Sequence, residues 1–203
     1  MASNSPRAAT YPIDPLFLER WSPRAFDGSK LSDTELFTIL DAAHWAPSSS
    51  NHQPWRFVYA HRESADWERF VGLLIPFNAI WARHAAVLLF ILSDTMIQLR
   101  RDAAPSVSHT HSFDAGAAWG FMALQAMRMG IYTHGMAGVD FARARTELSV
   151  PESFRIEAAI ALGRLGDKSK LPPEMQAREA PNGRRDLAEF VMEGHFAART
   201  SQA

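Results

Sequence analysis

An unbroken run of apolar residues, Ala85 to Leu92, limits the possible folds more than any other part of the sequence. The run has the length of a β-strand, and a strand without polar residues is typically buried on both of its faces. It is the longest apolar run in the chain, yet it is too short to span a bilayer, which takes about 20 residues in a helix. The run therefore predicts a strand inside a globular fold.

Helical and strand patterns precede this run. Ser32 and Glu35 have the spacing of a capping box, and the apolar stripe that starts at Leu36 predicts a helix that ends at Pro47. A shorter helix is expected within Pro12–Glu19. The other elements expected here are a strand in which Trp55, Phe57 and Tyr59 alternate with polar or smaller residues, and a helix that Ser64 caps and that ends near Pro76.

A second helix dominates the later half of the chain. Asp114–Met129 is apolar on nearly every side, which predicts a helix buried all round, and Gly130 suits the position just after its end. The polar stretch Ser93–Ser112 before it is expected to be a mobile loop near an active-site mouth, with Arg100–Phe113 as the candidate lid. The further elements expected are a strand over Ile131–His134, a helix capped by Asp140, a strand over Phe154–Leu162, a proline-bearing connection over Leu165–Asn182, and a final helical pattern with Leu187, Phe190 and Val191.

Length and composition exclude several kinds of function. The 203 residues suit one domain, and we expect a disordered arm over residues 1–11 and a single domain over residues 12–203. The formal net charge is −1 and no basic stripe is present, which excludes binding to nucleic acid through phosphate neutralisation. Without cysteine, disulfides and thiolate chemistry are excluded. The polar segment Met1–Pro15 has no apolar signal-peptide core, and we expect a cytoplasmic protein.

Two polar motifs offer ligand-binding groups. Ala46-Pro47-Ser48-Ser49-Ser50-Asn51-His52-Gln53-Pro54-Trp55-Arg56-Phe57 places hydroxyl, amide and backbone donors in a loop that two prolines stiffen, which suits a flat, polar ligand. Arg20-Trp21-Ser22-Pro23-Arg24 places two guanidinium groups and a hydroxyl within five residues, and arginine binds phosphate oxygens in a bidentate manner. The structural alternatives are a capped helix end with a tight turn for the first motif and a solvated basic turn for the second.

In order and spacing, these motifs resemble the FMN-dependent nitroreductase family. Two later stretches add to the resemblance, namely Gly130 to Asp140 and Gly183-Arg184-Arg185-Asp186-Leu187, so that it spans roughly Leu16 to Val191. The resemblance implies an α+β fold with a central mixed sheet flanked by helices, in an intertwined homodimer. It also implies an oxidoreductase that passes hydride from NAD(P)H through N5 of FMN to nitroaromatic, quinone or similar small-molecule acceptors.

The resemblance also assigns residues to the cofactor. The phosphate would be bound by Arg20, Ser22 and Arg24 with Arg184 or Arg185, and the sequence leaves open which of the last two takes part. Trp21, within the same motif, is also assigned to the cofactor site. The partner subunit would supply Pro47, Ser48, Ser49 and Asn51 to the ring and ribityl chain, and Asn78, Met136, Ala137 and Gly138 would complete the pocket. The backbone of Ala137 and Gly138 would face N5, with no catalytic side chain and no metal. For Asn78, an ordinary loop asparagine is the alternative.

Other functions remain open at this level. A related flavoenzyme that reduces an activated alkene, one that fragments its own flavin, and a non-catalytic FMN-binding protein are the alternatives. Asn51-His52-Gln53 fits the reductase form of the loop. The sequence contains no Gly-x-Ser-x-Gly motif, which would indicate a hydrolase. It also contains no Gly-x-Gly-x-x-Gly motif, which would indicate a separate dinucleotide site. His109 and His111 lack further ligands at metal-binding spacing. We therefore expect ping-pong turnover, in which nicotinamide and acceptor use one flavin face in turn.

Overall fold

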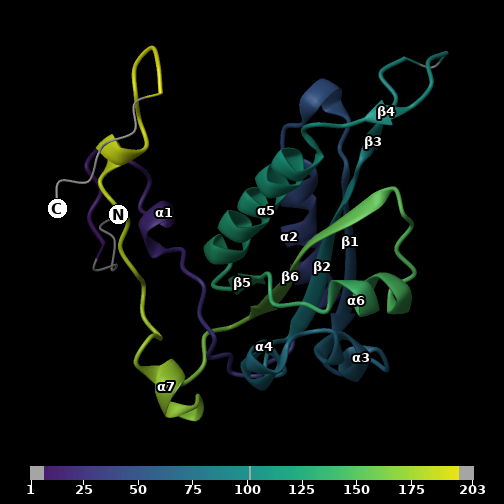
Figure 1. The fold of residues 1–203 in the computed structure, drawn as a ribbon. Coiled ribbons are helices and arrows are strands. Elements are labelled where there is room, and N and C mark those ends of the chain that lie inside the picture. Colours follow the sequence, from purple (N-terminus) through teal and green to yellow (C-terminus); the bar gives the residue numbers. More distant parts are fainter. Residues whose placement is uncertain (1–6, 101, 197–203) are drawn as a thin grey trace.

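The computed structural model describes residues 7–100 and 102–196, and its centre is a four-stranded sheet (Figure 1). The strand order is β1-β2-β6-β5, with bounds Trp55–His61, Val87–Asp94, Phe154–Gly163 and Tyr132–Met136. Every pairing in this sheet is antiparallel. The α+β class is confirmed, whereas the described strands do not pair in the mixed manner expected. A continuous apolar run shows that both faces of a strand are covered, and here helices cover both faces of an antiparallel sheet.

Strand β2 is buried on both faces, as its apolar run predicts. Leu88, Phe90 and Leu92 belong to one hydrophobic cluster, whereas Val87 and Leu89 belong to a second cluster on the opposite face. This division follows from the alternation of side chains along a strand. The strand therefore joins two cores, each of which a separate set of helices covers.

The helices cover the two faces of the sheet unequally. On one face, α2 (Asp33–His44) and α5 (His111–Arg128) pack against each other and against the sheet (Figure 1). On the other face lie three short helices, α3 (Trp67–Gly72), α4 (Pro76–Ala82) and α6 (Phe141–Glu147). The smaller elements are α1 (Leu16–Glu19), α7 (Pro173–Gln176), the hairpin strands β3 (Met96–Ile97) and β4 (Ser106–Val107), and 3-10 turns over Ser49–Asn51, Lys168–Lys170 and Leu187–Glu189.

Two of the predicted helix caps are confirmed and one is wrong. The Ser32 hydroxyl and the Glu35 carboxylate form the reciprocal capping box of α2, and Asp140 accepts a hydrogen bond at the start of α6. Ser64 does not cap a helix, because its hydroxyl donates to the carbonyl of His61 and α3 begins only at Trp67. Pro76 does not end that helix but begins α4, which places Asn78 in a helix instead of a loop.

Helix α5 differs from its prediction in two respects. It begins at His111, so the last two residues of the expected Ser93–Ser112 loop and the last three of the candidate lid, Arg100–Phe113, are helical. The His111 ring lies 2.8 Å from the Ser93 hydroxyl on β2, a contact between segments whose proximity local patterns do not reveal. The helix is also not buried on all sides within one chain, since the side chains of Phe113 and Phe121 are 80% and 43% exposed. One apolar face of α5 is therefore uncovered.

Segments near the two ends of the chain lie side by side (Figure 1). The Arg7 guanidinium donates to the carbonyl of Arg20 at 2.7 Å and to the Asn182 amide oxygen at 3.1 Å. The final helical pattern is wrong in length, because only a 3-10 turn, Leu187–Glu189, forms there. Residues 1–6 of the expected arm lie outside the described residues. Within the described ranges, no helix has the length and hydropathy that a membrane span requires.

Candidate functional site

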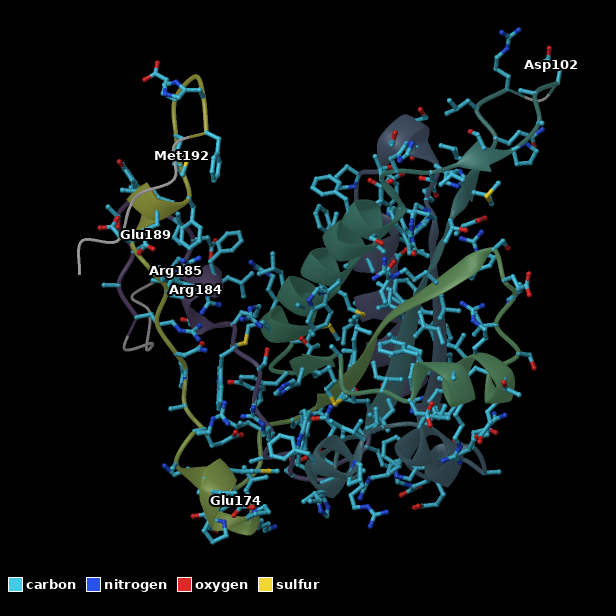
Figure 2. All side chains as sticks on the ribbon, in the orientation of Figure 1. Asp102, Glu174, Arg184, Arg185, Glu189 and Met192 are labelled. Atoms are coloured by element: carbon cyan, nitrogen blue, oxygen red, sulfur yellow. The ribbon has the colours of Figure 1, made fainter. Side chains whose placement is uncertain are left out.

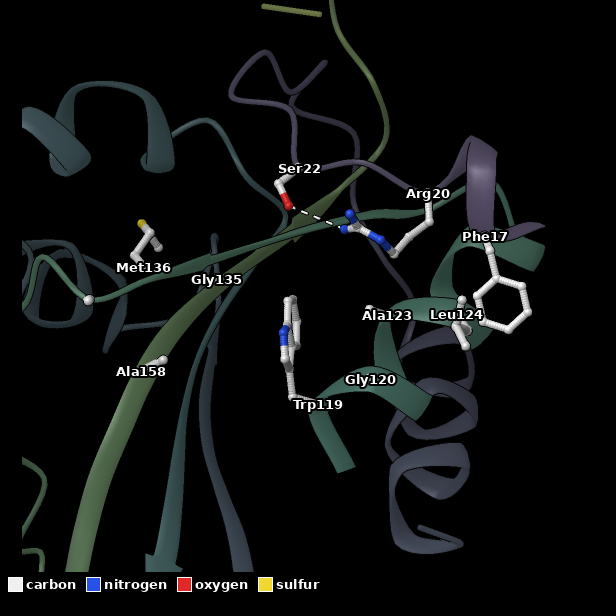
Figure 3. A pocket seen from close by; sticks show the side chains of 11 residues that line it. Phe17, Arg20, Ser22, Trp119, Gly120, Ala123, Leu124, Gly135, Met136 and Ala158 are labelled. Atoms are coloured by element: carbon white, nitrogen blue, oxygen red, sulfur yellow. Dashed lines mark hydrogen bonds between the residues drawn. The ribbon is translucent and has the colours of Figure 1, made fainter. Parts of the chain in front are cut away.

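A cavity of about 610 Å³ lies beside the C-terminal half of α5 (Figure 3). We call it the α5 cavity. Small and apolar residues from α5, β5 and β6 form most of its wall, and Arg20 and Ser22 close one end. Its lining residues are Phe17, Arg20, Ser22, Trp119, Gly120, Ala123, Leu124, Gly135, Met136, Ala137 and Ala158. A mostly apolar wall with a few polar groups at one end is typical of a site for a small organic ligand.

A second cavity, of about 560 Å³, adjoins the first at Arg20 and Ser22. We call it the basic cavity, because four guanidinium-bearing residues line it. The residues around it are Arg20, Trp21, Ser22, Arg24, His134, Ala177, Arg178, Ala180, Pro181, Asn182 and Arg184. Two chain segments that lie about 155 residues apart, for example at Arg24 and Glu179, thus build one positively charged site.

Arg20 stands where the two cavities meet. Its guanidinium donates to the Ser22 hydroxyl at 3.3 Å, and its side chain reaches into the space between Ser22 and Trp119 (Figure 3). Burial lowers the pKa of Arg20 from its ordinary value, and the charges of Arg7 and Arg184 lower it further. Positive charges held close together in a half-buried site repel one another, and a bound anion relieves that repulsion.

His134 adds a neutral polar group to the basic cavity. Its Nδ1 lies 2.8 Å from the carbonyl oxygen of Pro23, and its ring packs against Trp81 with the centroids 4.5 Å apart. Burial lowers the pKa of His134 to about 4, and the charges of Arg24 and Arg20 act in the same direction. The ring is therefore neutral at pH 7, with Nδ1–H donating to Pro23, and it holds the Arg20–Arg24 segment against β5.

The loop after β5 is fixed by contacts with α4. The Gly138 carbonyl accepts hydrogen bonds from the backbone of Ile75 and from the Asn78 amide, both at 3.1 Å. A Cβ on Gly138 would lie 2.4 Å from the Asn78 Nδ2 atom, so no larger residue fits without displacement. Asn78 and Gly138 thus stabilise the loop, while Met136 and Ala137 reach the α5 cavity.

The serine-rich loop lies elsewhere in the chain. None of its predicted site residues, which are Pro47, Ser48, Ser49 and Asn51, lines the α5 cavity or the basic cavity in the described structure. The loop rests against the opposite end of α5, where the Ser49 backbone donates to the Asp114 carboxylate at 3.2 Å. Ser50 and Asn51 have left-handed backbone angles, with φ of 51° and 53°. A single chain therefore does not bring this loop to Arg20.

Arg184 and Arg185, labelled in Figure 2, both line a cavity between the terminal segments, but their other contacts differ. Arg184 lines the basic cavity together with Arg20 and Arg24. Arg185 instead contacts Glu189 at 3.4 Å and stacks over the Phe190 ring at 4.7 Å, beside a third cavity between the terminal segments. Of the two candidates, the geometry brings Arg184 to the predicted phosphate-binding group.

Sequence reasoning missed several residues of the basic cavity. His134 was interpreted as part of a strand, and Arg178 as part of a connection between elements. His134 lies within the Gly130–Asp140 stretch but was given no role there, and Arg178 belongs to no local motif. Only the tertiary contacts place the two residues beside Arg20. No group of three or more potential metal ligands converges within residues 7–100 and 102–196.

Comparisons with known proteins agree with this geometry. A model of the nitroreductase family matches residues 18–75 and 76–164. A crystal structure of an oxidoreductase containing FMN is 51% identical, with 98% of this chain and 100% of that chain covered and a TM-score of 0.94. A protein from Desulfovibrio desulfuricans, assigned as a nitroreductase and solved with FMN, is 25% identical over 93% of this chain and 100% of its own, with a TM-score of 0.70. Spy0809 from Streptococcus pyogenes, which carries the name of an NAD(P)H nitroreductase, is 28% identical over 40% of each chain.

Proposed function

Because the chain belongs to the nitroreductase family, we propose that it is an FMN-dependent oxidoreductase that uses NAD(P)H to reduce nitroaromatics, quinones or similar flat acceptors. The observation that carries the proposal is the junction of a basic cavity with a largely apolar cavity at Arg20 and Ser22. This arrangement matches the two ends of FMN, which carries a phosphate at one end and a flat ring at the other. Two of the similar solved structures contain FMN, which supports the same assignment.

The residues present fit this cofactor. The guanidinium groups of Arg20, Arg24 and Arg184 would neutralise the phosphate through charge-assisted hydrogen bonds, with Arg178 at the rim. The wall formed by Trp119 and the β5 segment would receive the ring. When bound, FMN supplies the redox chemistry by taking hydride from NAD(P)H and passing it to the acceptor.

The protein's own contribution is position and charge. We assign the backbone of Ala137 and Gly138 to the N5 edge of the ring, because Asn78 fixes this loop at the cavity wall. No side chain is assigned as a general acid or base. An apolar slot discriminates weakly between similar acceptors, so broad acceptor tolerance is part of the proposal. The proposal also includes a cytoplasmic location, because NAD(P)H is supplied there.

We further propose a homodimer that shares each site between two subunits. The serine-rich loop of one chain lies away from its own basic cavity, so Ser48, Ser49 and Asn51 would complete the site of the second chain. The uncovered face of α5, which carries Phe113 and Phe121, provides an apolar surface for that contact. Burial of such a surface favours association.

The test is a visible spectrum of the purified protein before and after anaerobic addition of NADPH or NADH. A bound flavin that bleaches on addition supports the proposed reductase. A bound flavin that does not bleach indicates the non-catalytic FMN-binding protein, and loss of the flavin chromophore in air with formation of ring-cleavage products indicates fragmentation. Turnover with an activated alkene but with neither a nitroaromatic nor a quinone would replace the proposed acceptor class.

A further inference from the structure

We propose that Glu179 is a positioning residue that holds the Arg20–Arg24 segment in the shape that binds phosphate, so that its loss weakens FMN without weakening riboflavin. This inference rests on the proposed function and assigns a role in it to a buried carboxylate. Glu179 lies in the connection after α7, in a stretch with no sequence motif. It belongs to the few charged residues that are buried in the described structure, with 6% of its surface exposed.

The contacts of Glu179 are directed at the backbone of the predicted phosphate-binding segment. Its Oε1 accepts hydrogen bonds from the backbone N–H groups of Arg24, at 2.6 Å, and of Ala25, at 2.8 Å. These two N–H groups are consecutive, so the carboxylate fixes the direction of the chain at the residue from which the Arg24 side chain departs. Both hydrogen bonds depend on where this one oxygen lies, and a neutral amide oxygen has the two lone pairs needed to accept them as well.

The second carboxylate oxygen has a different environment. Glu179 Oε2 lies 3.8 Å from the Arg24 guanidinium and has no hydrogen-bond partner among the described residues. The Arg24 side chain is 19% exposed and lines the basic cavity. Its remaining N–H groups are therefore available to an anion in that cavity, while the contact with Glu179 restricts its position.

Glu179 also joins the two chain segments that form the basic cavity. Its neighbours Arg178 and Asn182 line the cavity from one side, and Arg24, whose backbone it holds, lines it from the other. A negative charge beside a phosphate site is electrostatically unfavourable, so its charge does not explain its presence there. The position of Oε1, which accepts the two backbone hydrogen bonds, explains why the residue is there. We therefore expect glutamine to substitute functionally for glutamate, because its side chain keeps a carbonyl oxygen at the same place.

The experiment compares binding of FMN and riboflavin to the full-length apoprotein by flavin fluorescence titration. For Glu179→Ala we expect FMN affinity to fall roughly tenfold or more, while riboflavin, which lacks the phosphate, binds with unchanged affinity. Glu179→Gln should restore FMN affinity to within about threefold of the wild type. Glu174→Ala, which removes an exposed carboxylate on α7 (Figure 2), is the matched control and should change neither affinity.

Each outcome decides the proposal. Equal weakening of FMN and riboflavin in Glu179→Ala would show a merely structural role, and unchanged FMN affinity would overturn the proposal directly. Failure of Glu179→Gln to restore affinity would contradict the proposal, because it would show that the charge is required and not the position of the acceptor oxygen. If the alanine variant does not fold, Glu179→Asp replaces it, because its shorter side chain cannot keep both hydrogen bonds and should show the same selective loss. A wild-type protein that binds no FMN would refute the proposed function itself.

Discussion

At the scale of single residues, the two adjacent arginines near the end of the chain give a matched pair of variants. Arg184 lines the basic cavity, whereas Arg185 is engaged by Glu189 and Phe190. A charge-assisted hydrogen bond contributes about 1.5–3 kcal/mol. We therefore expect Arg184→Ala to weaken FMN by roughly tenfold or more, and Arg185→Ala to weaken it by less than about threefold, in a fluorescence titration. Equal effects of the two variants would contradict the assignment.

His134 gives a prediction about pH. Its folded-state pKa of about 4 lies below its ordinary value of 6.5, chiefly because it is buried. Between these pH values the unfolded state binds a proton that the folded state does not. The free energy of unfolding therefore has its full value above pH 6.5 and decreases as the pH falls toward 4. From pH 7 to pH 5 this effect lowers the free energy of unfolding by about 2 kcal/mol.

The measurement for His134 is urea unfolding of the flavin-free protein at pH 7 and pH 5. His134→Asn keeps an N–H donor near the Pro23 carbonyl but does not titrate. We expect the loss of stability between the two pH values to be smaller in this variant by about 2 kcal/mol. The same pH dependence in the wild type and the variant would show that His134 does not contribute.

The residues of the basic cavity could be predicted only in part from the sequence. Arg20, Trp21, Ser22 and Arg24 form a local motif, and the structure brings them to one cavity as expected. The residues that the sequence did not reveal are His134, Arg178 and Glu179, which reach the same place from a strand and from a connection without a recognisable pattern. Their roles depend on contacts between residues more than 100 positions apart, and no local periodicity encodes such contacts.

At the scale of elements, the loop after β5 is held by close packing against α4. A side chain at Gly138 would meet the Asn78 amide and the Ile75 side chain within 3 Å. We expect Gly138→Ala to lower the free energy of unfolding by about 1–3 kcal/mol, because the neighbours must shift. Thermal unfolding measures the loss, and Asn78→Ala in the same chain should recover part of it. Full stability of the single variant would show that the loop is free to move.

Elements that carry a strong pattern were predicted well. The capping box of α2, the alternation in β1 and the apolar run of β2 led to the correct elements, because each signal is local. The failures occur where tertiary contacts decide the boundary. Helix α5 starts early beside Ser93, α3 starts late without a side-chain cap, and the final helical pattern stops after one turn.

At the scale of the whole molecule, the uncovered face of α5 leads to a prediction about assembly. We expect light scattering to give twice the chain mass of 22.7 kDa, with two FMN per dimer. Obligate interfaces commonly bury more than about 2,000 Å² of mainly apolar surface. Phe121→Glu places a charge on this face and should yield a monomer that has lost FMN affinity. A species of 22.7 kDa that retains stoichiometric FMN would exclude the shared site.

The arrangement of the cavities also predicts the kinetic scheme. The α5 cavity adjoins one basic cavity at Arg20, and the sequence has no Gly-x-Gly-x-x-Gly motif for a separate dinucleotide site. We therefore expect nicotinamide and acceptor to use the same place in turn. Steady-state rates with varied NAD(P)H and a quinone or nitroaromatic should give parallel double-reciprocal lines. Intersecting lines would indicate that both substrates are bound together.

The basic cavity, built from both ends of the sequence, has a consequence for synthesis of the protein. All four strands of the central sheet lie between Trp55 and Gly163, whereas the cavity needs Arg20 from before that span and Arg184 from after it. A nascent chain can therefore pair all four strands before the phosphate-binding end of its site is complete. Flavin capture would then require, besides the partner subunit, a chain that has emerged beyond Arg184, and a chain halted earlier would leave the ribosome colourless.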